Sequence, residues 1–196
     1  MKDYDIDVLV NKDNMLDINY VPSNLYVVDE NKNNFRNYQD PSLKPMLRLE
    51  VKPYIDALIR DANNLGLPLI VDSAYRSGVY QKQILDNEIK LKGVEAYKLV
   101  ALPGASEHQT GLAIDFAYYK DGVYNDDVKE SDKEAIWIKE NAYKYGFILR
   151  YPKGKEDITG FNFEPWHYRF VGLELALELY QTNQTLEEYK KCVKSL

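Results

Sequence analysis

Apolar residues recur at intervals of three and four within 43–65, and this spacing predicts a largely helical segment. They are Leu49, Ile55, Leu58, Ile59, Ala62 and Leu65. Gly66 follows where a C-terminal cap is expected, and Pro53 fits if the regular helix begins near residue 50. The residues before it, 1–42, are rich in Asn, Asp and Tyr and are expected to form an irregular arm ahead of a domain at 43–196.

A different pattern occurs at 112–118, where bulky and small side chains alternate strictly. Leu112, Ile114 and Phe116 share one face of this segment, and Asp115 lies between two alanines on the other face. The alternation predicts a strand that buries its bulky face and carries one acid on its opposite face.

The remaining elements follow from short β-rich runs, capping residues and helical spacing. Strands are expected at 68–73, 147–151 and 166–171, and helices at 79–92, at about 131–145 and at 173–180. Ser131 with Glu134 and Thr185 with Glu188 have the spacing of capping boxes, the second opening a short terminal helix. Because strands and helices are grouped rather than strictly alternating, the fold class is predicted to be α+β.

The amino-acid composition and the net charge exclude several classes of protein. The 196 residues are 45% hydrophobic and 29% charged, which is typical of a folded domain and not of disorder. The net charge of −6 argues against broad binding to nucleic acid or anionic lipid, and the single cysteine, Cys192, excludes an internal disulfide. A monomer is the default expectation.

The beginning of the chain and its hydropathy bear on localisation. No stretch reaches the roughly 18 apolar residues of a membrane span. The start, MKDYDIDVLVNKDN, lacks the apolar core of a signal peptide. Either the protein is cytoplasmic, or a leader has been removed and the protein acts in the cell wall or tethered to the membrane.

The two histidines carry the candidate chemistry. His108 lies in the run PGASEHQTGLAIDF with Asp115, and His167 lies in TGFNFEPWHYR with Glu164. Two imidazoles and one carboxylate are a three-ligand set for Zn²⁺ that leaves one position open for water, the pattern of a catalytic site. Glu164, three residues before His167, is the candidate proton acceptor for that water.

Each of these residues also has an ordinary structural interpretation. Either histidine alone could be a hydrogen-bonded residue of the core, Asp115 could lie on a solvated strand face, and Glu164 could be a surface charge. The residues alone do not bring the two runs together, and the helical motif with two histidines four apart is absent. A metal site and a purely structural role therefore both stay open at this point.

A third unusual run, VDSAYRSGVYQ, lies at a junction from strand to helix. Arg76 in this turn could grip a carboxylate through paired N–H donors, or it could form an ion pair with Asp72 nearby. Gln81 lies near the start of the following helix and can point back toward the turn.

Together the runs resemble a known family. SAYRSGVYQ, PGASEHQTGLAIDF, YGFILRYPKGKEDITGF and EPWHYRFVG occur in the order found in the VanY-type zinc D-alanyl-D-alanine carboxypeptidases and their close L,D-carboxypeptidase relatives. LVNKDN near the start and TLEEY near the end extend the resemblance over nearly the whole chain. The family fold is a small α+β domain with a central, mainly antiparallel sheet flanked by helices, similar in outline to hedgehog domains.

The resemblance implies a role for each matching residue. His108, Asp115 and His167 would bind one Zn²⁺ per chain. Glu164 would be the general base, and Arg76 would stabilise charge on the substrate. Gln81 and Ser106 would hold the terminal D-alanine. Trp166 and Tyr168 would line or support the pocket. One departure is Ala74, which stands where the family commonly has glycine.

The function expected from this resemblance is hydrolysis of D-Ala-D-Ala at the end of peptidoglycan stem peptides or their precursors. An L,D-carboxypeptidase acting on tetrapeptide stems is the alternative within the family. A non-catalytic module that binds wall peptides is an alternative of another class, whose signature would be the loss of Glu164 or of a ligand, and neither is lost. An endopeptidase of the same superfamily would need a pocket that is open beyond the terminal residue. The Arg76 turn argues against this alternative.

Overall fold

The computed structural model describes residues 3–28 and 44–194. Its strands are β1 (Leu25–Val27), β2 (Met46–Arg48), β3 (Leu69–Ser73), β4 (Ala113–Lys120), β5 (Val123–Asn125), β6 (Phe147–Leu149) and β7 (His167–Phe170). Its α-helices are α1 (Lys52–Asn64), α2 (Gly78–Lys92), α3 (Ala96–Leu99), α4 (Lys133–Asn141), α5 (Glu156–Thr159), α6 (Leu173–Thr182) and α7 (Leu186–Val193). Short 3₁₀ turns are η2 (Leu49–Val51), η3 (Gly93–Glu95), η4 (Glu107–Thr110) and η5 (Ala142–Tyr145). None of the described helices is long and apolar enough to cross a membrane.

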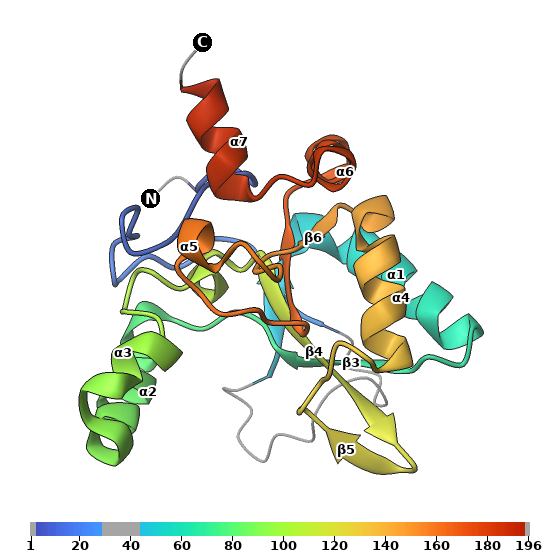
Figure 1. Ribbon diagram of the computed structural model, residues 1–196, viewed down its shortest axis with the longest axis horizontal. Helices are drawn as coiled ribbons and strands as arrows, with labels where there is room; N and C mark the ends of the chain where they lie inside the picture. Colours follow the sequence, from blue (N-terminus) through green and yellow to red (C-terminus); the bar gives the residue numbers. More distant parts are fainter. Residues whose placement is uncertain (1–2, 29–43, 195–196) are drawn as a thin grey trace.

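The centre of the fold is an antiparallel sheet with the strand order β3-β4-β7-β6, and β5 pairs with the far end of β4. Figure 1 shows α1 and α4 together on one side of these strands and α2 with α3 on the other. The predicted α+β class and its antiparallel central sheet are therefore confirmed.

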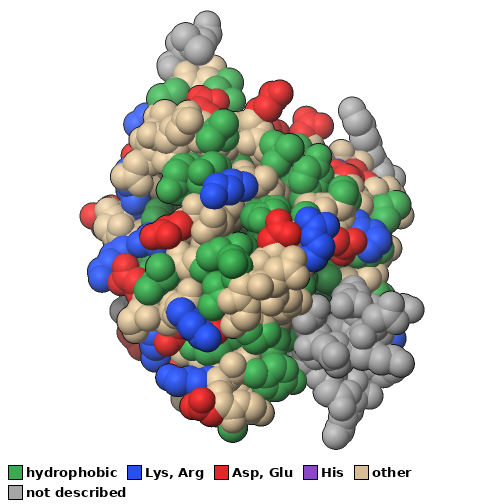
Figure 2. Space-filling view, turned by 90° about the vertical axis from the view of Figure 1, so that its right-hand side faces the viewer, with side chains coloured by type: hydrophobic (Ala, Val, Ile, Leu, Met, Phe, Trp, Pro, Cys, Tyr) green, Lys and Arg blue, Asp and Glu red, His purple; other side chains and the backbone are tan. Residues whose placement is uncertain are grey.

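The main core covers one face of the sheet. Ile114 and Phe116 of β4 point into it, as the alternation predicted, together with Phe147, Tyr168 and Phe170 of the neighbouring strands. Ile55, Leu58 and Ile59 of α1 pack against these side chains. The opposite face of β4 and β7 carries the polar residues of the site. Figure 2, which looks at the side of the molecule with α1 and α4, shows acidic and basic side chains interspersed, and no histidine is visible there.

Two local predictions were wrong. Residues 46–48 are not helical but form β2, which pairs with β1, so the regular helix begins only at Lys52 with Pro53 in its first turn. The capping box expected at Ser131 is absent, because Asp132 is the N-cap of α4 and its carboxylate accepts instead from the backbone N–H of Lys129. The capping box of Thr185 and Glu188 at α7 is confirmed.

The described part of the expected arm, residues 3–28, packs along the domain, and its predicted boundary at residue 42 lies outside the described residues. The side-chain amide of Gln109 donates to the carbonyl oxygens of Asp17 (2.7 Å) and Tyr20 (3.1 Å). The backbone N–H of Leu16 donates to the carbonyl oxygen of Gly104 at 2.8 Å. These contacts join the arm to the loop that carries His108.

Replacing Gly104 with alanine should destabilise the protein more than the same change at Gly122. Both glycines have a positive φ (+87° and +78°), so each alanine loses about 1–2 kcal/mol of backbone energy. A Cβ at Gly104 would lie 2.5 Å from the carbonyl oxygen of Leu16, whereas no atom of the described residues lies within 4 Å of a Cβ at Gly122. We expect G104A to lose about 1–3 kcal/mol more than G122A in urea unfolding. Equal losses would show that the arm yields freely at this contact.

Candidate active site

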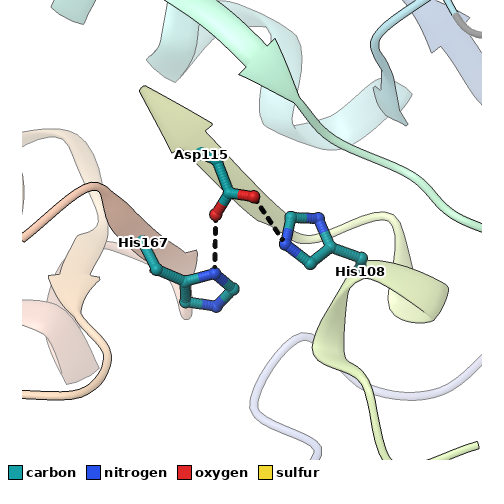
Figure 3. Close-up of side chains that lie close together, drawn as sticks. All are labelled: His108, Asp115 and His167. Atoms are coloured by element: carbon teal, nitrogen blue, oxygen red, sulfur yellow. Dashed lines mark hydrogen bonds and ion pairs between the residues drawn. The ribbon is translucent and has the colours of Figure 1, made fainter. Parts of the chain in front are cut away.

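The register between β4 and β7 brings two of the predicted metal ligands together. Asp115 and His167 are directly opposite each other in this antiparallel pair, so their side chains leave the same face of the sheet. Nδ1 of His167 lies 2.8 Å from Oδ1 of Asp115. Figure 3 shows both side chains turned toward each other from their neighbouring strands.

The third predicted ligand, His108, comes from η4, the short turn that precedes β4. Its Nδ1 lies 2.6 Å from the carbonyl oxygen of Ala74, which can only accept a hydrogen bond, so Nδ1 carries the hydrogen. Its Nε2 points at Oδ2 of Asp115, 3.1 Å away (Figure 3). Gly111 ends the turn in the left-handed conformation (φ +69°), which is favourable for glycine.

The geometry fits a bound cation. One ligand atom from each of His108, Asp115 and His167 lies within 4.8 Å of the others. Burial and the charge of Arg76 lower the pKa of His108 and favour its neutral form, so its Nε2 presents a lone pair. Within the described residues this buried atom has no hydrogen-bond partner, and it faces a carboxylate oxygen. Such an arrangement is repulsive unless a proton or a metal cation lies between the two atoms, and two nitrogens with one oxygen suit Zn²⁺.

The titratable residues of the site have pKa values that are shifted in different directions. Burial opposes the charge of Asp115, but the two imidazoles outweigh it and hold its pKa well below the usual range. Burial likewise opposes a charge on His167, yet the hydrogen bond to Asp115 and the nearby carboxylate of Glu107 raise its pKa to about 9. For Glu164, burial is the largest effect and raises its pKa. Its Oε2 lies 3.9 Å from Nδ1 of His167, beside the proposed metal ligands.

A cavity of about 230 Å³ opens over this cluster. Besides the three candidate ligands, five of the predicted site residues line it: Arg76, Gln81, Ser106, Glu164 and Trp166. The backbone N–H of Arg76 donates to the carbonyl oxygen of His108, which ties the Arg76 turn to the ligand loop. The amide of Gln81 donates to the carbonyl oxygen of Ala101 at 2.9 Å.

Tyr168 does not line the cavity. It follows His167 in β7, so its side chain leaves the opposite face of the sheet, where it is fully buried and packs against Phe116. Its position supports the strand from behind the site. Asp72, the alternative partner considered for Arg76, accepts a hydrogen bond from the hydroxyl of Tyr124, and Arg76 lines the cavity.

Two side chains at the site were not singled out from the sequence. Tyr151 stacks on the His167 ring, with centroids 4.9 Å apart and planes inclined by 24°. Glu107 is wholly buried behind the same ring, with Oε2 3.7 Å from Nε2 of His167. Tyr151 follows an apolar strand, where aromatic residues are common, so its position in the sequence did not mark it as a site residue. An acid directly before a candidate ligand was the available signal for Glu107.

Comparison with known proteins identifies the family. The family model of VanY, D-alanyl-D-alanine carboxypeptidase, matches residues 44–173. A D-alanyl-D-alanine carboxypeptidase of Enterococcus faecalis is 40% identical over 151 residues, which are 72% of this chain and 54% of that protein. The bifunctional D-Ala-D-Ala dipeptidase and carboxypeptidase VanXYC of Enterococcus gallinarum is 35% identical over 92% of this chain and 91% of its own length. The chain belongs to the VanY family of D-alanyl-D-alanine carboxypeptidases.

Solved structures agree with this assignment. The LD-carboxypeptidase LdcB has a TM-score of 0.84 and 42% identity, covering 93% of this chain and 84% of LdcB. A vancomycin-resistance D,D-pentapeptidase VanY in complex with Zn(II) has a TM-score of 0.75 and 34% identity, covering 94% of this chain and 98% of that one. The fold of this chain is therefore the D,D-peptidase-like fold.

Removing one candidate ligand should remove the metal. We expect about one zinc per chain in the purified protein by elemental analysis, and H167A should bring the zinc content close to zero after dialysis, because two ligands hold Zn²⁺ far more weakly than three. E164Q is the matched control, since Glu164 lies in the same cavity outside the ligand cluster, and it should keep its zinc. Full zinc in H167A would contradict the ligand set.

Proposed function

We propose that this chain is a zinc-dependent carboxypeptidase that removes the C-terminal D-alanine from peptidoglycan stem peptides, with the D-Ala-D-Ala bond of pentapeptides as its substrate. The observation that carries this proposal is the cluster of His108, Asp115 and His167 at one end of a cavity that also contains Glu164 and Arg76. Membership of the VanY family and the Zn(II) complex of a related VanY support it.

Glu164 has the position and environment of the general base. A zinc ion held by the three ligands would polarise the scissile carbonyl and make a water molecule more acidic. Glu164 accepts the proton of that water and returns it to the leaving amine, so one carboxylate serves both steps. Burial raises the pKa of Glu164 above that of an ordinary glutamate and so toward neutral pH. Such a pKa suits a group that both accepts and donates a proton. The presence of this base argues against a module that only binds peptides.

Arg76 supplies the positive charge that a peptide terminus needs. Arg76 lines the cavity, where its guanidinium group can bind the terminal carboxylate or the developing oxyanion. Gln81 and Ser106 line the same cavity and offer hydrogen bonds to the terminal D-alanine. A pocket that pairs its arginine with a substrate carboxylate selects the end of a chain, since an extended peptide leaves that arginine unpaired.

An L,D-carboxypeptidase that removes the C-terminal D-alanine of tetrapeptides is the second candidate. In that substrate the residue preceding D-alanine has a long side chain. A second hollow of about 150 Å³ shares Val100, Ala101 and Phe161 with the catalytic cavity, and it provides room for such a side chain. The likeness to LdcB also supports this candidate.

Replacing the base should remove turnover and leave the metal in place. For E164Q we expect kcat to fall by about 100- to 10,000-fold, because general acid–base catalysis is lost while the ligands are untouched. E130Q is the matched control: Glu130 is a surface residue that pairs with Lys153, and its loss should leave kcat unchanged. Release of D-alanine, zinc content and thermal unfolding should be measured for both. Wild-type turnover in E164Q would remove Glu164 from the role of base.

Three synthetic peptides distinguish the substrate classes. With the zinc-loaded protein, we expect faster release of D-alanine from the pentapeptide than from the tetrapeptide, and no cleavage of a pentapeptide with an amidated C-terminus, because the amide cannot pair with Arg76. Preference for the tetrapeptide would assign L,D-specificity. Efficient cleavage of the amidated peptide would contradict recognition of the terminal carboxylate.

A further inference from the structure

Glu107 is a wholly buried carboxylate that the proposed reaction does not use. It directly precedes the candidate ligand His108, and its Oε1 accepts hydrogen bonds from Nε of Arg150 and Nη1 of Arg169, each 2.8 Å long. The side chains of all three residues are fully shielded from solvent. Burying an acid is costly without such partners, and the two arginines hold the pKa of Glu107 well below its usual range against the opposing effect of burial.

The second oxygen of this carboxylate faces the ring of His167. Oε2 of Glu107 and Nε2 of His167 are 3.7 Å apart, and neither atom has a hydrogen-bond partner within the described residues. On its other side, the ring presents Nδ1 to Asp115 at 2.8 Å (Figure 3). The imidazole therefore lies between two carboxylates, one in the ligand cluster and one behind it.

The surroundings of Glu107 leave its Oε2 directed at the ring. Arg150 makes a bidentate ion pair with Glu187 (2.6 and 2.8 Å), and Arg169 donates to the carbonyl oxygens of Ile6 and Val8 at 2.9 Å. Both guanidinium groups are thereby held in place, and both donate to Oε1 of Glu107. A network with a purely structural purpose would have no need of the unpaired Oε2, because a buried charged oxygen without a donor is destabilising.

We propose that Glu107 is a positioning residue for the metal centre: its Oε2 accepts a hydrogen bond from Nε2–H of His167 and so keeps Nδ1 of that ring directed at the metal. This inference rests on the proposed function, since it assigns Glu107 a role toward the same zinc site. A metal-bound histidine needs its second nitrogen protonated and held, and losing such a partner typically weakens metal binding about 10- to 100-fold. The present 3.7 Å separation exceeds a hydrogen bond, and we expect it to shorten when the ring binds metal.

The variant E107Q tests this inference because its amide is nearly the same shape. Arg150 and Arg169 can only donate, so they require the amide oxygen, and the amide NH₂ then faces His167. A donor would meet the Nε2–H donor, and the supporting hydrogen bond would be lost. We expect zinc affinity, measured by chelator competition, to fall about 10- to 100-fold.

E187Q is the matched control. Glu187 belongs to the same arginine network, but its carboxylate contacts Arg150 and Asn11 and not the His167 ring. Both variants should lower the thermal stability of the metal-free protein, and only E107Q should lower zinc affinity. Equal losses of zinc affinity in the two variants, or none in E107Q, would overturn the proposal in favour of a structural network.

A second measurement begins with the wild-type protein, so its first result does not depend on any variant folding. The chain has only two histidines, so ¹⁵N NMR of the imidazoles in the zinc-loaded protein gives a simple spectrum. His167 should carry its hydrogen on Nε2 and bind the metal through Nδ1, and E107Q should perturb the His167 Nε2–H signal while E187Q leaves it unchanged. A metal on Nε2 of His167 would overturn the role of Glu107. Failure of the wild-type protein to bind zinc would instead contradict the proposed function itself.

Discussion

The antiparallel register of β4 and β7 is the constraint on which the site depends. It places Asp115 directly opposite His167, so a carboxylate and an imidazole from positions far apart in the chain meet on one face. Because side chains alternate along a strand, the same register puts Ile114 and Tyr168 into the core. A slip of one residue in either strand would exchange these two sets. The burial of the apolar face therefore enforces the pairing of the polar one, and the site inherits its geometry from the core.

Electrostatic differences allow residues of one type to have different roles around this pairing. Asp115 is held ionised by two imidazoles and Glu107 by two arginines, despite their burial. The pKa of Glu164 is raised by burial, with the charge of His167 acting against this effect. Acids with depressed pKa values suit ligation and support, and an acid with a raised pKa suits proton transfer. The division of roles proposed for this site follows from what each carboxylate touches.

Local patterns in the sequence were sufficient for the central strands and most helices, because alternation and capping residues are visible without knowing the fold. The two isolated histidines and Asp115 were candidate ligands from the residues alone, and the family resemblance was needed to favour a metal site over a structural role. The strand at 46–48 was missed because its partner, β1, is distant in sequence and its apolar residues also fit a helical spacing. Placing Tyr168 at the pocket overlooked that it must point away from its neighbour His167. Glu107 and Tyr151 could not be assigned because their importance lies in contacts with His167 across the fold.

Both ends of the described chain contact the two arginines that pair with Glu107. Carbonyl oxygens of Ile6 and Val8 bind Arg169, and Glu187 of α7 binds Arg150, so both terminal segments hold the guanidinium groups that pair with Glu107. Figure 1 shows α7 beside the first part of the chain. Since a guanidinium group buried without its partners is costly, these segments stabilise the two buried arginines as well as covering the sheet. Neither segment lines the catalytic cavity.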